Sequence, residues 1–200
     1  AVNLEAPYAK PLATKIKFNS TMTIAENKPL RMRLNYNNLL NLALILNSKG
    51  SSLKLTAADL RIGSGDADWP KSDGLYISGN LNSLDMETIK SYAGRAHNPD
   101  LPDLTLKEVD ITTQSLSILG QDLSNVRLQV VPDGADFNVG ISNAAINGRV
   151  RMPANMSSRD TITARFDKLD LKTKSSKVAD NVDITSLPAI DFAANNVSIN

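Results

Sequence analysis

The sequence predicts a mostly β protein, built as an extended, curled antiparallel β-sheet with one short helix near residues 83–93. The main observation is that apolar residues occupy every second position in most of the chain, most regularly from Leu101 to Met152. This period sends successive side chains to opposite faces of a sheet. Turn-forming residues such as Pro132-Asp-Gly134 separate the apolar runs. Short runs between turns favour hairpins with one apolar and one polar face.

Each predicted strand is a run in which apolar and polar residues alternate. In the first strand, Ile16, Phe18 and Met22 share one face, while Lys, Asn and Thr take the other. Between Phe166 and Leu169 the phase slips by one residue, which predicts a β-bulge near Asp167-Lys168. The predicted strands cover residues 14–24, 30–36, 39–47, 53–62, 75–81, 104–111, 115–119, 125–131, 136–141, 144–152, 162–171, 187–192 and 197–200.

One segment departs from the strand pattern. Residues 83–93 are predicted to form a helix, since Ser83 or Asp85 can cap its N-terminus and Gly94 can end it. Met86 and Ile89 would form its buried side. We expect this helix to cover one end or the outer face of the sheet.

A repeat indicates how the chain is organised. Leu101-Pro-Asp-Leu-Thr-Leu and Leu187-Pro-Ala-Ile-Asp-Phe share their spacing, at an offset of 187 minus 101, or 86 residues. Cassettes that start near 101 and 187 favour a repetitive, extended body over a closed globule. We therefore predict an introductory segment at 1–13 and a repetitive β body at 14–200. The sequence has no initiator Met and stops inside an expected strand, so we expect a piece of a longer protein.

The composition excludes several classes of function. A balance of 22 basic to 21 acidic residues argues against binding to nucleic acid, which requires a clustered basic face. With no cysteine, disulfides, thiolate metal sites and a cysteine nucleophile are all ruled out. The longest apolar stretch, Leu39 to Leu46, is far below the roughly 20 residues that a membrane-spanning helix needs.

No motif for chemistry stands out. The segment Gly63-Ser-Gly65-Asp66-Ala-Asp68 resembles a calcium or phosphate loop, but Trp69-Pro70 blocks the helix that a phosphate loop requires. The more frequent role of such a segment is a glycine-rich turn. His97 is the single histidine, so neither a metal triad nor a catalytic triad can form around it. We expect a protein that is not an enzyme and holds no cofactor or metal.

Two blocks of the sequence resemble the YhdP-like branch of the AsmA superfamily, which consists of large bacterial envelope proteins. The first block runs from Leu60-Arg-Ile-Gly-Ser-Gly through Trp69-Pro70 and Gly74-Leu-Tyr-Ile-Ser-Gly79 to Leu84-Asp85. The second contains Leu101-Pro-Asp-Leu, Ser117-Ile-Leu-Gly-Gln-Asp-Leu123 and Val126-Arg-Leu, and the pattern restarts at Leu187-Pro188. Order and spacing carry the resemblance, since each element is degenerate. Ser124 stands where the family usually has Gly.

The resemblance implies a periplasmic β-groove held by an inner-membrane anchor that this sequence lacks. Its partners would be phospholipid acyl chains, the inner membrane and the outer membrane. Such proteins resemble bridge-type lipid transporters, in which acyl chains slide along an apolar groove between the two membranes. The family has no catalytic residues to carry over.

The residues themselves leave two hypotheses open. An apolar sheet face that is not covered by protein can accept acyl chains, whereas a filled sandwich or solenoid would be a structural or interaction module of the envelope. Alternation is the same in both cases, so each groove candidate could equally be ordinary core. The candidates are Ile16, Phe18, Leu30, Met32, Leu34, Leu128, Val130, Val139, Ile141, Ile162, Ala164 and Phe166.

Overall fold

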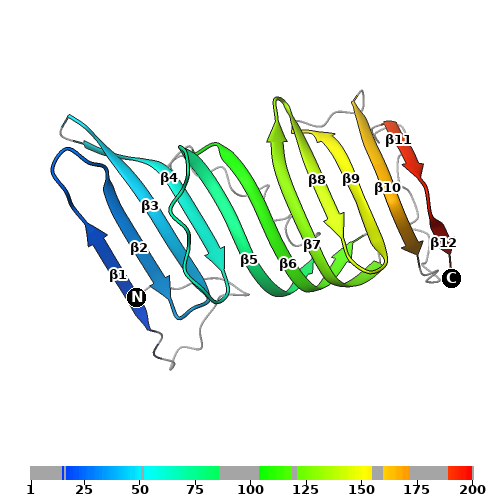
Figure 1. Ribbon diagram of the computed structural model, residues 1–200, viewed down its shortest axis with the longest axis horizontal. Helices are drawn as coiled ribbons and strands as arrows, with labels where there is room; N and C mark the ends of the chain where they lie inside the picture. Colours follow the sequence, from blue (N-terminus) through cyan, green and yellow to red (C-terminus); the bar gives the residue numbers. More distant parts are fainter. Residues whose placement is uncertain are drawn as a thin grey trace, which may run out of the picture. The chain divides into compact units, whose positions relative to one another are not determined.

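A computed structural model describes residues 15, 17–50, 52–85, 104–118, 121–154, 160–171 and 189–199. These residues form one mixed sheet whose strand order follows the chain from β1 to β11, with β12 beside β10 (Figure 1). The prediction of a mostly β protein is confirmed. The strands are β1 Phe18–Thr23, β2 Leu30–Tyr36, β3 Leu40–Lys49, β4 Ser52–Ile62, β5 Gly74–Asp85, β6 Leu106–Ile118, β7 Gln121–Asp133, β8 Asp136–Ser142, β9 Ile146–Pro153, β10 Thr161–Leu171, β11 Ala189–Ala194 and β12 Val197–Ile199.

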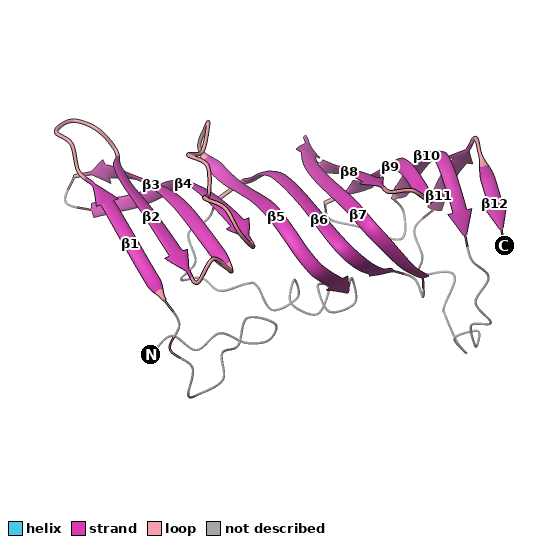
Figure 2. Ribbon diagram, turned by 60° about the horizontal axis from the view of Figure 1, so that its bottom comes forward, coloured by secondary structure: helices cyan, strands magenta, loops and turns pink. Residues whose placement is uncertain are grey.

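The predicted helix does not begin where the sequence placed it. Among the described residues Figure 2 shows strands and loops only, and Ser83 to Asp85 continue β5. The backbone groups that a cap would have satisfied belong to the sheet instead. Leu84 packs against the apolar core of the neighbouring strands, which favours the extended conformation. Residues 86–93 lie outside the described residues, as do His97 and the cassette starts at 101 and 187.

The sheet is not purely antiparallel, which corrects the second part of the fold prediction. β5 runs parallel to β4, and both β11 and β12 run parallel to β10. The first parallel pair has a clear cause. Residues 63–73 carry the chain from the end of β4 at Ile62 back to Gly74, which pairs with Ala57 near the middle of β4. Parallel strands require this kind of crossover connection. Residues 172–188, which precede β11, are outside the described range.

One predicted turn is absent. Thr112, Thr113 and Gln114 read as a break between two short strands, yet β6 runs through them and pairs with β7, Thr112 opposite Arg127 and Thr113 opposite Val126. The Thr113 side chain is fully buried, and its hydroxyl donates to the Ser115 carbonyl at 2.8 Å. A local hydrogen bond of this kind satisfies a polar side chain without ending the strand.

The chain forms two compact units. The first contains the described residues up to Asn80 together with 104–106, and the second contains those from Leu81 to Asp85 and from Lys107 onward. In the second unit Leu116, Leu123, Val126, Ile146 and Leu169 form a buried apolar cluster. Leu116 is on β6 and Leu169 on β10, four places apart in the strand order. The second unit is therefore curled, with its apolar face inside.

Candidate functional site

The second unit has one apolar face that crosses six consecutive strands. Paired residues in a sheet share a face, so the register decides which side chains lie together. Val130 pairs with Val139, Val139 with Val150, and Val150 with Ala164, which in turn pairs with Phe192. We call this surface the unit-2 apolar face. Its residues from β6 to β11 include Val109, Ile111, Leu128, Val130, Phe137, Val139, Ile141, Val150, Met152, Ile162, Ala164, Phe166, Ile190 and Phe192.

The two ends of this face differ in how well they are covered. At one end the face closes on itself around the buried cluster, and Leu128, Ile141 and Phe166 pack against that cluster. At the other end, Val139 and Ile162 are only half-buried. On β11 the side chains of Ile190 and Phe192 are 66% and 53% exposed. The face is thus a filled core at one end and an open apolar surface at the other.

The first unit carries a second, broader apolar face. Leu34, Leu42, Leu60 and Ile77 form one row across β2 to β5, and Met32, Leu44, Ala58 and Leu75 form the next. Of these eight residues only Ala58 is buried, at 4% exposure. Phe18 and Met22 of β1 are more than half exposed on the same side. We call this surface the unit-1 apolar face.

The opposite, polar side of the first unit is the covered one. Residues 63–73 lie over it, where Asn41 donates to the Gly63 carbonyl at 3.0 Å and Arg61 to the Ser64 carbonyl at 3.0 Å. The Trp69 ring lies 4.7 Å from the Arg33 guanidinium and 5.3 Å from that of Arg31, within the range of cation–π contacts. Residues beneath this segment are almost fully buried, namely Asn41, Ala43, Ala57 and Asp59.

The predicted groove residues divide between the two apolar faces. Phe18, Leu30, Met32 and Leu34 lie on the unit-1 apolar face. Ile16 is outside the described residues. Every one of the remaining seven lies on the unit-2 apolar face: Leu128, Val130, Val139, Ile141, Ile162, Ala164 and Phe166. Their role in binding lipid stays a prediction. Sequence reasoning left out Leu42, Leu44, Leu60 and Ile77, although their alternation was the available signal.

The comparison with protein families decides which group the chain is part of. The family model described as YhdP protein matches residues 1–200. The chain belongs to the YhdP family. This is an AsmA-like family of the cell envelope, which confirms the resemblance seen in the sequence. The search of curated proteins found none that matches the chain.

In this YhdP-family chain, ion pairs lie on the polar sides of the strands. In the second unit Arg127 contacts Asp110 at 2.6 Å, and this bond holds the pKa of the Asp110 carboxyl below its usual value. Arg165 forms an ion pair with Asp191 across β10 and β11, and this contact lowers the pKa of Asp191. These are exposed pairs between neighbouring strands, so they fix strand register more than they add stability.

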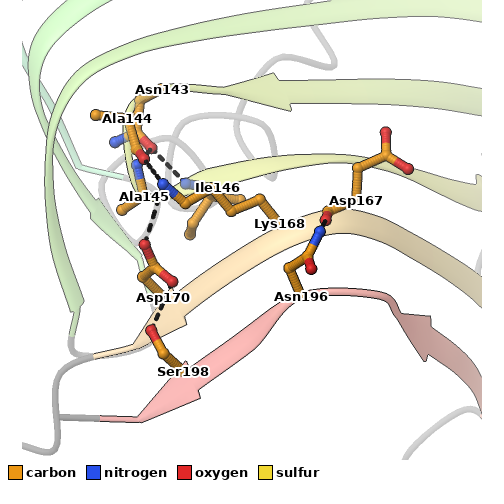
Figure 3. A network of polar contacts seen from close by, with 9 residues as sticks. All are labelled: Asn143, Ala144, Ala145, Ile146, Asp167, Lys168, Asp170, Asn196 and Ser198. Carbon is orange, nitrogen blue, oxygen red and sulfur yellow. Dashed lines mark hydrogen bonds and ion pairs between the residues drawn. The ribbon is translucent and has the colours of Figure 1, made fainter.

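A polar network holds the bulge of β10. The register shifts between Phe166 and Lys168, as the phase slip predicted. Asn143 caps its own turn by accepting from the backbone N–H of Ala145 and Ile146, while Lys168 donates to the Ala144 carbonyl at 2.6 Å (Figure 3). On the other side, Ser198 of β12 donates to Asp170. The bulge brings Leu169 into phase with the buried cluster.

The remaining polar groups give no metal site in the part of the chain that the structure describes. Asp66 is exposed and approaches Arg33 at 4.0 Å. Asp68 hydrogen-bonds to Asp59 through its backbone N–H, and burial together with the nearby Asp68 carboxylate raises the pKa of Asp59. No group of three metal-ligating side chains occurs among the described residues of this YhdP-family chain, and none of its described helices could cross a membrane.

Proposed function

We propose that the two apolar faces bind the acyl chains of phospholipids, and that the full-length YhdP-family protein carries phospholipid between the inner and outer membranes. In this proposal the protein is not an enzyme. It stands in the periplasm, anchored in the inner membrane through a segment outside this sequence. One observation carries the proposal: rows of Leu, Ile, Val and Met side chains run across neighbouring strands with much of their surface open.

The energetics of such a surface favour long hydrocarbon chains. Each methylene moved from water onto an apolar surface contributes roughly 0.8 kcal/mol, so a chain of ten methylenes gains about 8 kcal/mol at full burial. The rows contain no charged side chain, so no point along them would hold a headgroup. A headgroup would stay in water at the open side, and a nearly uniform apolar surface would let the chains slide.

Photo-crosslinking in cells tests the proposal. A photoreactive residue is placed at Val139 or Ile162 on the unit-2 apolar face, and at Asn138 or Thr163 as the matched control. Each control is the sequence neighbour of a test position and points to the opposite side of the same strand. We expect phospholipid adducts at Val139 and Ile162 and few at the controls. Equal labelling at all four positions, or none in folded protein, would argue against lipid binding.

A second function is favoured by the buried cluster around Leu116, which is an ordinary filled core. If the rest of the unit-2 apolar face were covered by protein in the same way, the chain would be a structural or interaction module of the envelope. Native mass spectrometry of the purified 200-residue chain separates the two. Bound phospholipid favours the carrier, and a lipid-free chain with unlabelled inward positions favours the structural module.

A further inference from the structure

The polar side of the second unit contains a hollow that the lipid-binding proposal does not use. Its volume is about 500 Å³, within the range typical of small-molecule sites. Its polar lining comes from four neighbouring strands and comprises Gln129, Ser142, Asn147, Arg149, Arg165 and Asp167. The hollow therefore faces away from the unit-2 apolar face and does not depend on it.

Gly140 creates the space. It lies in register between Gln129 of β7 and Arg149 of β9, in the middle of the polar side. A Cβ at Gly140 would meet nothing nearer than 3.7 Å, and this glycine is not among those with a positive φ. Neither packing nor backbone conformation requires a glycine here. Its consequence is room beside the Arg149 side chain.

The charges around this space are not balanced within the described residues. Arg149 and Arg165 lie directly opposite each other on β9 and β10, an arrangement in which like charges repel. Arg165 is compensated, since its guanidinium bonds to the Asp191 carboxylate and donates to the Asp191 carbonyl at 2.8 Å. The Arg149 guanidinium has no hydrogen bond or ion pair with any described residue. A planar guanidinium of this kind is suited to a phosphate or a carboxylate.

A carboxylate faces the same hollow one row further along the sheet. Asp167 is the bulged residue of β10, left unpaired between Phe166 and Lys168, and its backbone carbonyl is fixed by Asn196 at 2.9 Å. Figure 3 shows its carboxylate turned away from that network. Asp167 is two residues from Arg165, so the acidic and basic positions are roughly 7 Å apart along the strand. This separation of charges disfavours a simple anion and matches a ligand with a charge of each sign.

We propose that this hollow binds a small zwitterion, with its phosphate or carboxylate at Arg149 and its ammonium group at Asp167. Gln129, Ser142 and Asn147 supply hydrogen bonds between the two ends. The ligand is either a free molecule or the headgroup of a lipid in a bilayer, since both present the same charges. In each case it approaches from the polar side of the sheet.

Amide NMR of the 200-residue chain, titrated with O-phosphoethanolamine, tests the proposal. We expect saturable, millimolar shifts at the amides of Gly140, Arg149 and Asp167. Arg149→Gln weakens binding at least tenfold, and Gly140→Gln does so by filling the hollow. Asp167→Asn weakens O-phosphoethanolamine several-fold but leaves inorganic phosphate bound equally well or better, because only the ammonium loses its partner.

The matched control is Arg151→Gln. Arg151 is on the same strand and side as Arg149, but it is paired with Asp136 at 2.8 Å and lies outside the hollow. This variant should change binding less than twofold. Absent saturation, equal losses in the Arg149 and Arg151 variants, or equal effects of Asp167→Asn on both probes would each overturn the proposal. Vesicles containing phosphatidylethanolamine then identify the source: shifts at the same amides indicate a lipid headgroup, and none indicates a free molecule.

Discussion

Replacing Gly148 with alanine tests how the unit-2 apolar face is built. A Cβ at this position would lie 2.2 Å from Cδ1 of Phe166 and 2.7 Å from the backbone oxygen of Arg165. The Phe166 ring is constrained in turn, since it packs against the buried cluster and lies 5.8 Å from the Phe192 ring. The backbone oxygen cannot rotate away, so both strands must shift. Overpacking of this kind costs about 1–3 kcal/mol, and we expect the upper part of that range.

The same substitution at Gly140 is the control. Gly140 is on the adjacent strand, and a Cβ there has ordinary contacts at 3.7 Å or more. Gly140→Ala should leave stability unchanged or raise it by about 0.5–1 kcal/mol, since Gly is unfavourable in a strand interior. Hydrogen exchange at the amides of β9 and β10 measures both effects locally. With Gly148→Ala these amides should exchange about 30-fold faster for a loss of 2 kcal/mol. Equal protection in the two variants would refute the proposed contact between Phe166 and the Gly148 backbone.

Three further predictions concern the core and the ionisable groups. Leu116→Ala should cost about 2–5 kcal/mol because the side chain is fully buried, whereas Leu53→Ala, at 59% exposure, should cost under about 0.5 kcal/mol by urea unfolding. The raised pKa of Asp59 means that the folded state loses stability as pH rises from the unfolded pKa, about 3.8, through the folded one; Asp59→Asn should therefore stabilise the protein at neutral pH, with the gain vanishing below pH 3.8. The lowered pKa of Asp110 has the opposite sign: its stabilising contact with Arg127 is complete above the unfolded pKa and lost as pH falls through the folded one, so Asp110→Asn should flatten the acid limb of a stability–pH curve.

Most strands could be predicted because alternation determines them locally. β2 begins at Leu30 and ends at Tyr36, as the sequence indicates, and the bulge between Phe166 and Lys168 follows from a one-residue slip that any other phase would have placed in water. The faces followed as well, since each candidate groove residue with a described strand partner lies on an apolar face. These features depend only on neighbours in the chain.

The direction of pairing and the end of β5 could not be predicted in this way. Whether β5 runs parallel to β4 depends on where residues 63–73 lie over the sheet, and this is a tertiary property. Ser83 and Asp85 are good helix caps by composition, but the packing of Leu84 against the buried cluster outweighs that preference. The zwitterion hollow was also invisible, because Arg149 and Arg165 become neighbours only through the register of β9 and β10.

The placement of residues 63–73 is difficult to explain by stability alone. Covering the unit-1 apolar face would have buried leucines, whereas covering the polar side leaves the Asp59 Oδ1 and Arg33 Nε atoms buried without a hydrogen-bond partner among the described residues. A buried polar group without a partner costs about 1–3 kcal/mol. Sequences accept such local conflicts mainly where function requires them. An apolar side kept free for a ligand is such a requirement, so the energetically unfavourable position of this crossover supports the lipid-carrier proposal over the structural module.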